Sequence, residues 1–281
     1  MSYIITDDKH YKNIAKSLRS KLRTDKKYGP SEMATAIDNI PSSADGTDEP
    51  IGGIYLLNPD ENGNPTEVKV IGLKKNTEPV SSILTNNNIR NSVKKITFSN
   101  VSITNINDKD FSDLKNLEEF FVPDGVTYIG WHAFSGCEHL KKIVIPEGIT
   151  QINQGTFNKC GMLEELYIPK GVTSISYQSI MNCYSLKTIF FPNSLTVTHT
   201  YFSSGLNVSF DNPILEDGFN CNNFPLAVSS LYSRETILKC LDALADRTGL
   251  ATYTLAIGST NLKKLTDSDI EIATNKNWFI R

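Results

Sequence analysis

The 281-residue sequence has no long hydrophobic run and no strong excess of charge of either sign. No stretch approaches the ~20 consecutive apolar residues of a transmembrane helix, so we expect no insertion into a membrane. The net charge is −3, which creates no field that would attract nucleic acid or an anionic surface. The first residues lack a basic segment followed by an apolar core, which predicts synthesis in a cytosol without a secretory signal.

Motifs that carry catalysis or nucleotide binding are missing as well. The sequence has no glycine-rich phosphate-binding loop, and no serine, cysteine or threonine lies in a nucleophile motif. The four histidines, at positions 10, 132, 139 and 199, are scattered along the chain. We therefore expect no catalytic residues, no cofactor and no metal site, and hence a protein that is not an enzyme.

Cysteine is scarce, and its spacing argues against a disulfide scaffold. Three of the five cysteines, Cys137, Cys160 and Cys183, are 23 residues apart. No histidine or aspartate shares this spacing, which disfavours a metal site, whereas free cysteine packs well as a small apolar residue. We expect these three thiols to be buried, one above the other.

What the sequence does contain is a repeat. Leucines at 117, 140, 163 and 186 and prolines at 123, 146, 169 and 192 follow one another in steps of 23 residues. A fixed period in the low twenties with a Leu-x-x-apolar-x-apolar strand predicts an α/β repeat solenoid of parallel strands, in which one repeat is one coil. A divergent first coil, one residue longer, begins at residue 93. The leucine and the next two alternate apolar residues of each coil are expected to point inward: Leu117, Phe120, Val122; Leu140, Ile143, Ile145; Leu163, Leu166, Ile168; Leu186, Ile189, Phe191.

Alternation along the strands also predicts the residues that face solvent. One column is apolar: Phe121, Val144, Tyr167 and Phe190. In two further columns the charge alternates from coil to coil, and opposite charges in successive coils are expected to pair and set the register. One column is Glu119, Lys142, Glu165 and Thr188; the other is Glu118, Lys141, Glu164 and Lys187. An exposed apolar column on the concave face is typical of a partner or ligand surface, although a loop or a neighbouring subunit could cover it. We assign ligand binding to Phe121, Val144, Tyr167, Phe190, Glu119, Lys142 and Glu165.

Residues 1–40 predict a helical hairpin that anchors the chain. One helix presents Ile14, Leu18 and Leu22 on a single face, and a shorter one presents Met33 and Ile37. Such a short pair buries little surface alone, so we expect it to dock on copies of itself or on a larger assembly. The composition of residues 41–50 predicts a linker.

The repeats are flanked by two further units. Residues 51–92 predict a β-hairpin and N-terminal cap, residues 93–218 the solenoid, and residues 219–281 C-terminal strand–helix repeats that cap it. A strand near residues 206–210 is expected to continue the sheet. In the C-terminal unit, Ser233 and Thr266 are expected to begin helices, and Gly249 to end the first of them.

The repeat pattern L-x-x-[IVLF]-x-[IVF]-P-x-G-[VI]-T-x-I, followed by F-x-x-C, resembles BspA-like leucine-rich repeats over about residues 93–200. This resemblance implies adhesion or binding of a protein or glycan. Residues 14–40 resemble an N-terminal helical segment of phage virion proteins, with Leu18 in place of the usual isoleucine and without the usual glycine after the first helix. Residues 52–72 resemble the hairpin that follows it, and residues 248–278 resemble a unit found after such repeats in phages and prophages of Gram-positive bacteria.

Together these resemblances imply a bacteriophage virion protein, part of a tail, baseplate or fibre, assembled in the cytoplasm of the bacterial host. Its N-terminal segment would contact other virion proteins, its repeats would bind a host-surface glycan or protein, and the chain would form a homo-oligomer. A purely structural virion part, such as a head fibre or connector decoration, and a bacterial surface adhesin are the alternatives.

Overall fold

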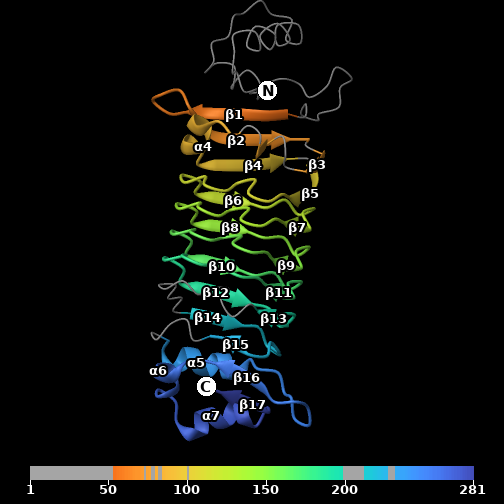
Figure 1. Ribbon diagram of the computed structural model, residues 1–281, viewed down its shortest axis with the longest axis vertical. Coiled ribbons are helices and arrows are strands. Elements are labelled where there is room, and N and C mark those ends of the chain that lie inside the picture. Colours follow the sequence, from red (N-terminus) through yellow and green to blue (C-terminus); the bar gives the residue numbers. More distant parts are fainter. Residues whose placement is uncertain are drawn as a thin grey trace, which may run out of the picture.

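The structure is a computed structural model, and it describes residues 53–72, 74–76, 80–81, 84–99, 101–198, 212–226 and 232–281. The predicted anchoring residues Ile14, Leu18, Leu22, Met33 and Ile37 lie outside these ranges, as does the predicted linker. The described part forms an elongated stack in which strands one coil apart lie side by side (Figure 1).

The main sheet runs along one side of this stack. It begins with the antiparallel hairpin of β1 (Gly53–Pro59) and β2 (Pro65–Ile71), where the sequence predicts one. Parallel pairing then continues from β2 through β4 (Lys95–Ser99), β6 (Glu119–Phe121) and β8 (Lys142–Val144). A second parallel group follows, with β10 (Glu165–Tyr167), β12 (Thr188–Phe191) and β14 (Asn212–Leu215).

The register of these strands confirms the predicted repeat. Glu119 pairs with Lys142, and Glu165 with Thr188, each 23 residues on. Lys95 pairs with Glu119, so the first coil is one residue longer, as predicted. The strand expected near residues 206–210 lies outside the described ranges, and β14, which pairs with β12, begins at Asn212 instead. The 23-residue pattern decays after Phe191, so the repeat spacing could not place β14.

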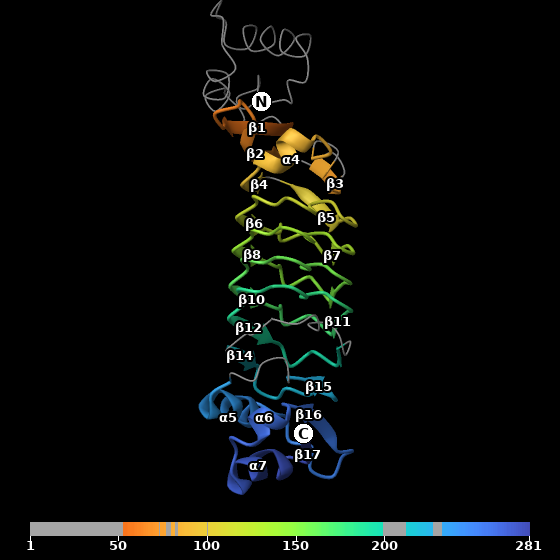
Figure 2. The same cartoon turned by 60° about the vertical axis from the view of Figure 1, so that its left-hand side comes forward.

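A second row of short strands lies on another side of the stack (Figures 1 and 2). One group comprises β3 (Lys74–Asn76), β5 (Ser102–Ile106) and β7 (Tyr128–Ile129); the other comprises β9 (Gln151–Ile152), β11 (Ser174–Ile175) and β13 (Val197–Thr198). All are parallel. Gly125, Gly148 and Gly171 lie in the turns between the two rows, after the proline of each coil.

Each coil closes through a turn segment with a regular backbone. The same repeat position has a left-handed φ in four coils: 61° at Lys109, 55° at His132, 61° at Gly155 and 54° at Gln178. Only one of the four is glycine, so the backbone hydrogen bonds between neighbouring coils hold this conformation against its usual cost. Gly155 is required for a second reason, because a Cβ there would lie 2.2 Å from Nδ1 of His132 in the coil before.

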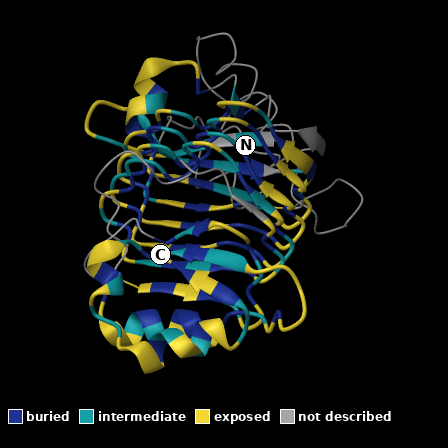
Figure 3. Ribbon diagram, turned by 60° about the horizontal axis from the view of Figure 1, so that its bottom comes forward, coloured by how far each residue is buried: buried dark blue, intermediate teal, exposed yellow. Residues whose placement is uncertain are grey.

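The interior of the stack is built from ladders of like residues. All twelve residues predicted to point inward are buried, and buried residues lie inside the coils while exposed ones follow the outer turns (Figure 3). Phe134 stacks between Phe111 and Phe157, with ring centroids 5.5 and 6.0 Å apart. The thiols of Cys137, Cys160 and Cys183 are buried as predicted; each donates to the carbonyl of a phenylalanine in the preceding coil.

The C-terminal unit continues the stack with strands and helices of its own. Its strands are β15 (Phe224–Pro225), β16 (Tyr253–Ala256) and β17 (Trp278–Ile280). Its helices are α5 (Arg234–Asp242), α6 (Ser259–Leu262) and α7 (Asp267–Thr274); a further helix, α4 (Asn87–Ser92), lies near the other end. Ser233 and Thr266 cap α5 and α7, as predicted.

One expectation for this unit is wrong, and one helix was not expected. Helix α5 ends at Asp242, not at Gly249, because the next residues pair with the chain beside them: Phe219 donates to the carbonyl of Ala243, and Ala245 donates back to that of Phe219. Helix α6 was not predicted. It begins after Gly258, and it is too short to show a helical pattern in the sequence.

Candidate functional site

The outward face of the main sheet carries the predicted apolar column. Phe121, Val144 and Tyr167 are 46, 42 and 45% exposed, and Phe190 is half-buried. Each residue pairs with the next at the same strand position, except across β8 and β10, which belong to different hydrogen-bonded groups. Ile214, which pairs with Phe190 in β14 and is also exposed, extends the column. Sequence reasoning missed Ile214 because it expected that strand several residues earlier.

Two of the three rings of this column stack on each other, and the third lies below a lysine. The centroids of Tyr167 and Phe190 are 4.5 Å apart with planes inclined by 11°, and Nζ of Lys142 lies 5.8 Å from the centroid of Phe121. Stacked rings turn one face toward each other, so less of each face is available to a ligand. The result is an apolar strip about 20 Å long, estimated from five strands spaced ~4.8 Å apart.

Charged side chains border this strip. Glu119, Lys142 and Glu165 are exposed and stand in one column, as predicted, but no ion pair joins these three residues; Lys142 lies over the ring of Phe121 instead. In the neighbouring column the expected pairs do form, between Lys141 and Glu118 at 3.2 Å and between Lys187 and Glu164 at 3.1 Å.

An ion pair that sequence reasoning missed lies beyond the strand ends. Nζ of Lys170 is 2.7 Å from Oε1 of Glu216, and the hydrogen bond with Glu216 is the main cause that raises the pKa of Lys170. The same contact lowers the pKa of Glu216, whose other oxygen accepts the backbone N–H of Asn193. Because Glu216 follows β14, this pair could be recognised only once that strand had been placed.

The buried thiols offer no nucleophile. Burial raises the pKa of Cys137 and of Cys183 to about 12 and raises that of Cys160 well above its usual range, so these thiols stay protonated near neutral pH. Within the described ranges, no cluster of three or more histidine, cysteine, aspartate or glutamate side chains could hold a metal ion. The described helices likewise include none with the length and apolar character to cross a bilayer.

Several solved structures are similar to this chain. The T. pallidum leucine-rich repeat protein is 16% identical, with a TM-score of 0.43 over 82% of this chain and 95% of that one. A leucine-rich cell surface protein from Faecalibacterium prausnitzii is 20% identical, with a TM-score of 0.38 over 59% of this chain, which spans only 40% of that protein. The pneumococcal vaccine antigen PcpA is 13% identical, with a TM-score of 0.39 over 79% of this chain and 61% of that one. Similarity of this degree does not indicate what the chain binds.

The family comparison is more specific. No curated protein sequence matches the chain. Residues 83–208, however, match the model of the BspA-type leucine-rich repeat region in six copies, and they include the coils whose strands keep the 23-residue register. This central part of the chain is therefore a BspA-type leucine-rich repeat region.

Proposed function

We propose that the chain is a non-enzymatic component of a bacteriophage tail, baseplate or fibre, attached through its N-terminal segment and recognising the host surface through its repeats. The phage context rests on the resemblance of residues 14–40, 52–72 and 248–278 to segments of phage virion proteins. The recognition role rests on one observation: the apolar column of Phe121, Val144, Tyr167, Phe190 and Ile214, in which all members but the half-buried Phe190 are exposed.

This column has the composition of a protein interface. Apolar side chains form its centre, and Glu119, Lys142 and Glu165 form a charged border, which corresponds to the apolar core and polar rim of many protein–protein contacts. Four apolar side chains of the column are more than 40% exposed. This exposure forgoes burial energy of about 25 cal/mol per Å², and such surfaces commonly mark binding sites. Since the rings of Tyr167 and Phe190 stack on each other, the strip suits a host-surface protein better than a sugar ring.

Binding to host cells tests the recognition role. Fluorescently labelled protein should bind cells of the bacterium that propagates the phage, and the double variant Phe121→Ala, Tyr167→Ala should lose that binding. A matched control, Tyr184→Ala with Leu250→Ala, removes two exposed apolar side chains elsewhere and should bind as wild type does. Equal thermal stability of the variants shows that folding is not the cause. Undiminished binding by the first variant would exclude the column as the site.

Particle assembly tests the anchor. A chain that lacks residues 1–40 should fail to enter virions, which immunoblotting of purified particles would reveal; normal incorporation contradicts the assignment. The alternatives separate in the same experiments. A purely structural virion part would enter particles without labelling cells, and a bacterial adhesin would be found on cells that carry no phage.

A further inference from the structure

Strands β7, β9 and β11 lie on another side of the stack from the main sheet (Figure 1). A second row of residues follows two positions after the ends of these three strands. Its members are Trp131, Gln154 and Tyr177, at one repeat position in three successive coils. Backbone hydrogen bonds align them: the N–H of His132 donates to the carbonyl of Gln154 at 2.9 Å, and that of Gly155 donates to the carbonyl of Tyr177 at 3.1 Å.

The backbone after each member is left-handed, with φ of 55°, 61° and 54°. With the turn repeated in this way, the Cα–Cβ bonds of the row start in similar directions. Trp131 is 55% exposed and Tyr177 is also exposed, while Gln154 between them is half-buried. Strands ~4.8 Å apart place residues two coils apart about 10 Å from each other. The row therefore presents two aromatic side chains about 10 Å apart, with an amide between them.

The segments that lead into the row are polar but uncharged. Residues 127–131, 150–154 and 173–177 contain no aspartate, glutamate, lysine, arginine or histidine. Hydroxyls and amides fill the space instead: Nε2 of Gln178 donates to the hydroxyl of Tyr177 at 3.0 Å, and Nε2 of Gln151 donates to Oγ of Ser176 at 3.0 Å. This composition contrasts with the main-sheet face, where charges border the apolar column.

One carboxylate marks the end of the row. Asp108 occupies the same repeat position in the coil before Trp131, and its Oδ1 accepts the backbone N–H of Trp131 at 2.7 Å. Its charge also reaches Tyr128, an exposed neighbour whose pKa is raised by burial and, second, by Asp108. A carboxylate accepts hydrogen bonds from hydroxyl groups and repels anions.

We propose that the row of Trp131, Gln154 and Tyr177 is a second binding site, which takes an extended, uncharged polysaccharide. Aromatic side chains combine an apolar face with rigid shape, and the C–H face of a sugar ring can stack on it. Two aromatic rings two coils apart match alternate sugar units of an extended chain. The amide of Gln154 and the carboxylate of Asp108 are placed to bond with sugar hydroxyls, and Asp108 disfavours anionic polymers. The site does not depend on the main-sheet proposal.

Tryptophan fluorescence reports on this site directly. The chain has two tryptophans, Trp131, which is exposed, and Trp278, which is 1% exposed. The probes are neutral hexasaccharides of β-1,4-linked N-acetylglucosamine, β-1,4-linked glucose and α-1,4-linked glucose, with polygalacturonate as the anionic comparison. At least one neutral probe should produce a saturable blue shift in the emission of Trp131. Polygalacturonate should produce none.

Variants separate this site from the main-sheet face. Tyr177→Ala keeps Trp131 as the fluorescent reporter and should weaken binding of the neutral probe at least tenfold. Trp131→Phe should abolish the blue shift, because only the emission of Trp278 remains. The double variant Phe121→Ala, Tyr167→Ala should bind the probe as wild type does. The proposal is overturned if no neutral hexasaccharide shifts the emission, if polygalacturonate binds as well, or if folded Tyr177→Ala retains full affinity. None of these results affects the cell-binding test of the main-sheet face.

Discussion

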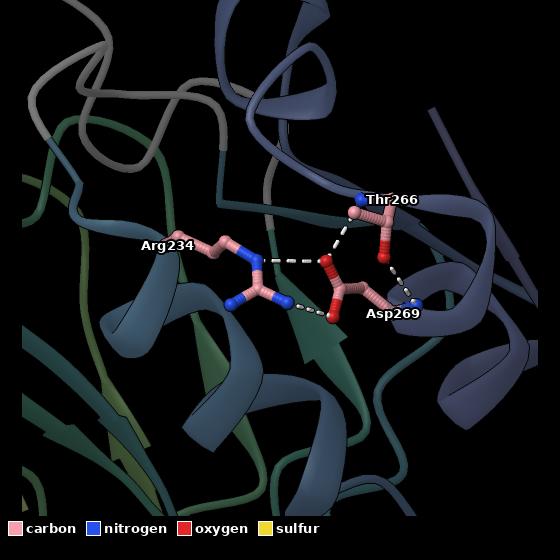
Figure 4. Close-up of polar contacts among 3 residues, drawn as sticks. All are labelled: Arg234, Thr266 and Asp269. Atoms are coloured by element: carbon pink, nitrogen blue, oxygen red, sulfur yellow. Dashed lines mark hydrogen bonds and ion pairs between the residues drawn. The ribbon is translucent and has the colours of Figure 1, made fainter.

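The regular coils and the C-terminal unit are held together in different ways. In the coils, two contacts recur from repeat to repeat: phenylalanine rings stack, and thiols donate to the carbonyls of the preceding coil. In the C-terminal unit each contact occurs once. Arg234 binds both oxygens of Asp269, at 2.9 and 2.5 Å, and Asp269 also accepts the N–H of Thr266 (Figure 4). The guanidinium of Arg247 lies 3.4 Å from the ring centroid of Tyr253.

The difference follows from position in the stack. An inner coil has a neighbour above and below, so each apolar layer is covered by another of the same kind, and stability is close to a sum of repeat and nearest-neighbour terms. The C-terminal unit has the coils on one side and buries apolar residues of its own. It does so with helices α5 and α7, which contact each other and carry the two partners of the Arg234–Asp269 pair.

The largest effect is expected from a substitution that interrupts the stack of phenylalanine rings inside the coils. Phe134→Ala removes a fully buried ring that packs against Phe111, Phe120 and Phe157, and we expect a loss of about 3–5 kcal/mol in the free energy of unfolding. Urea denaturation followed by circular dichroism measures it. Phe121→Ala, on the exposed face, is the control and should cost less than about 1 kcal/mol. Similar losses of unfolding free energy in both variants would contradict the role of the stacked rings in stabilising the coils.

The next effect tests the contact on which the C-terminal unit relies. Hydrogen bonds from Arg234 and then from Thr266 hold the pKa of Asp269 at about 2. Because this pKa lies below its value of about 4 in an unfolded chain, the contact stabilises the fold above about pH 4, and that stability is lost as the pH falls toward 2. Asp269→Asn should lower the melting temperature at pH 7, and its difference from wild type should shrink between pH 4 and pH 2. Asp267→Asn, in the same helical turn, is the control; a constant difference across that range would refute the assignment.

A smaller effect tests whether the coils interact only with their neighbours. Cys160→Ala should cost about 1 kcal/mol, because a buried sulfur and its contact with the carbonyl of Phe134 are lost. In double-mutant cycles, Cys160→Ala should be non-additive with Cys183→Ala in the adjacent coil. The effects of Cys137→Ala and Cys183→Ala on the free energy of unfolding should be additive, because these residues are two coils apart. Coupling of equal size in both cycles would show that coils interact beyond their nearest neighbours.

The smallest effect concerns the charged columns outside the coils. Lys187 and Glu164 are 3.1 Å apart, but both side chains are more than half exposed, and such pairs contribute at most about 1 kcal/mol. Glu164→Gln should change the free energy of unfolding by less than about 0.5 kcal/mol, and high salt should remove even that difference. A loss comparable to that of Phe134→Ala would mean that the ion pair, and not the interior, holds these coils in register.

The repeat part of this fold was predictable because the same pattern of apolar residues recurs in every coil. Leu117, Leu140, Leu163 and Leu186 recur at one spacing, and alternation along a strand then determines which neighbours are buried and which are exposed. The exposure of Phe121, Val144 and Tyr167 follows from the same argument. Strand β14 was not predicted because the coil that precedes it no longer carries this pattern.

Other features depend on contacts between residues far apart in the sequence. Nothing local marks Lys109, His132 or Gln178 for a left-handed backbone, which glycine adopts most readily; hydrogen bonds from adjacent coils impose it. Lys142 was expected to pair with glutamates above and below it, but it lies over the ring of Phe121. The row of Trp131, Gln154 and Tyr177 was likewise not recognised, because two aromatic residues 46 positions apart become a pair only when the coils stack.

Periodicity alone was sufficient to establish the stack, its register and its buried residues, because each coil repeats one short apolar pattern and identical patterns bury their apolar faces best against each other. The contacts between helices α5 and α7, the end of helix α5 at Asp242 and the alignment of Trp131, Gln154 and Tyr177 in one row were settled only by the folded chain. Those features depend on which distant segments meet, and a single pass along the sequence contains no periodic signal for such unique contacts.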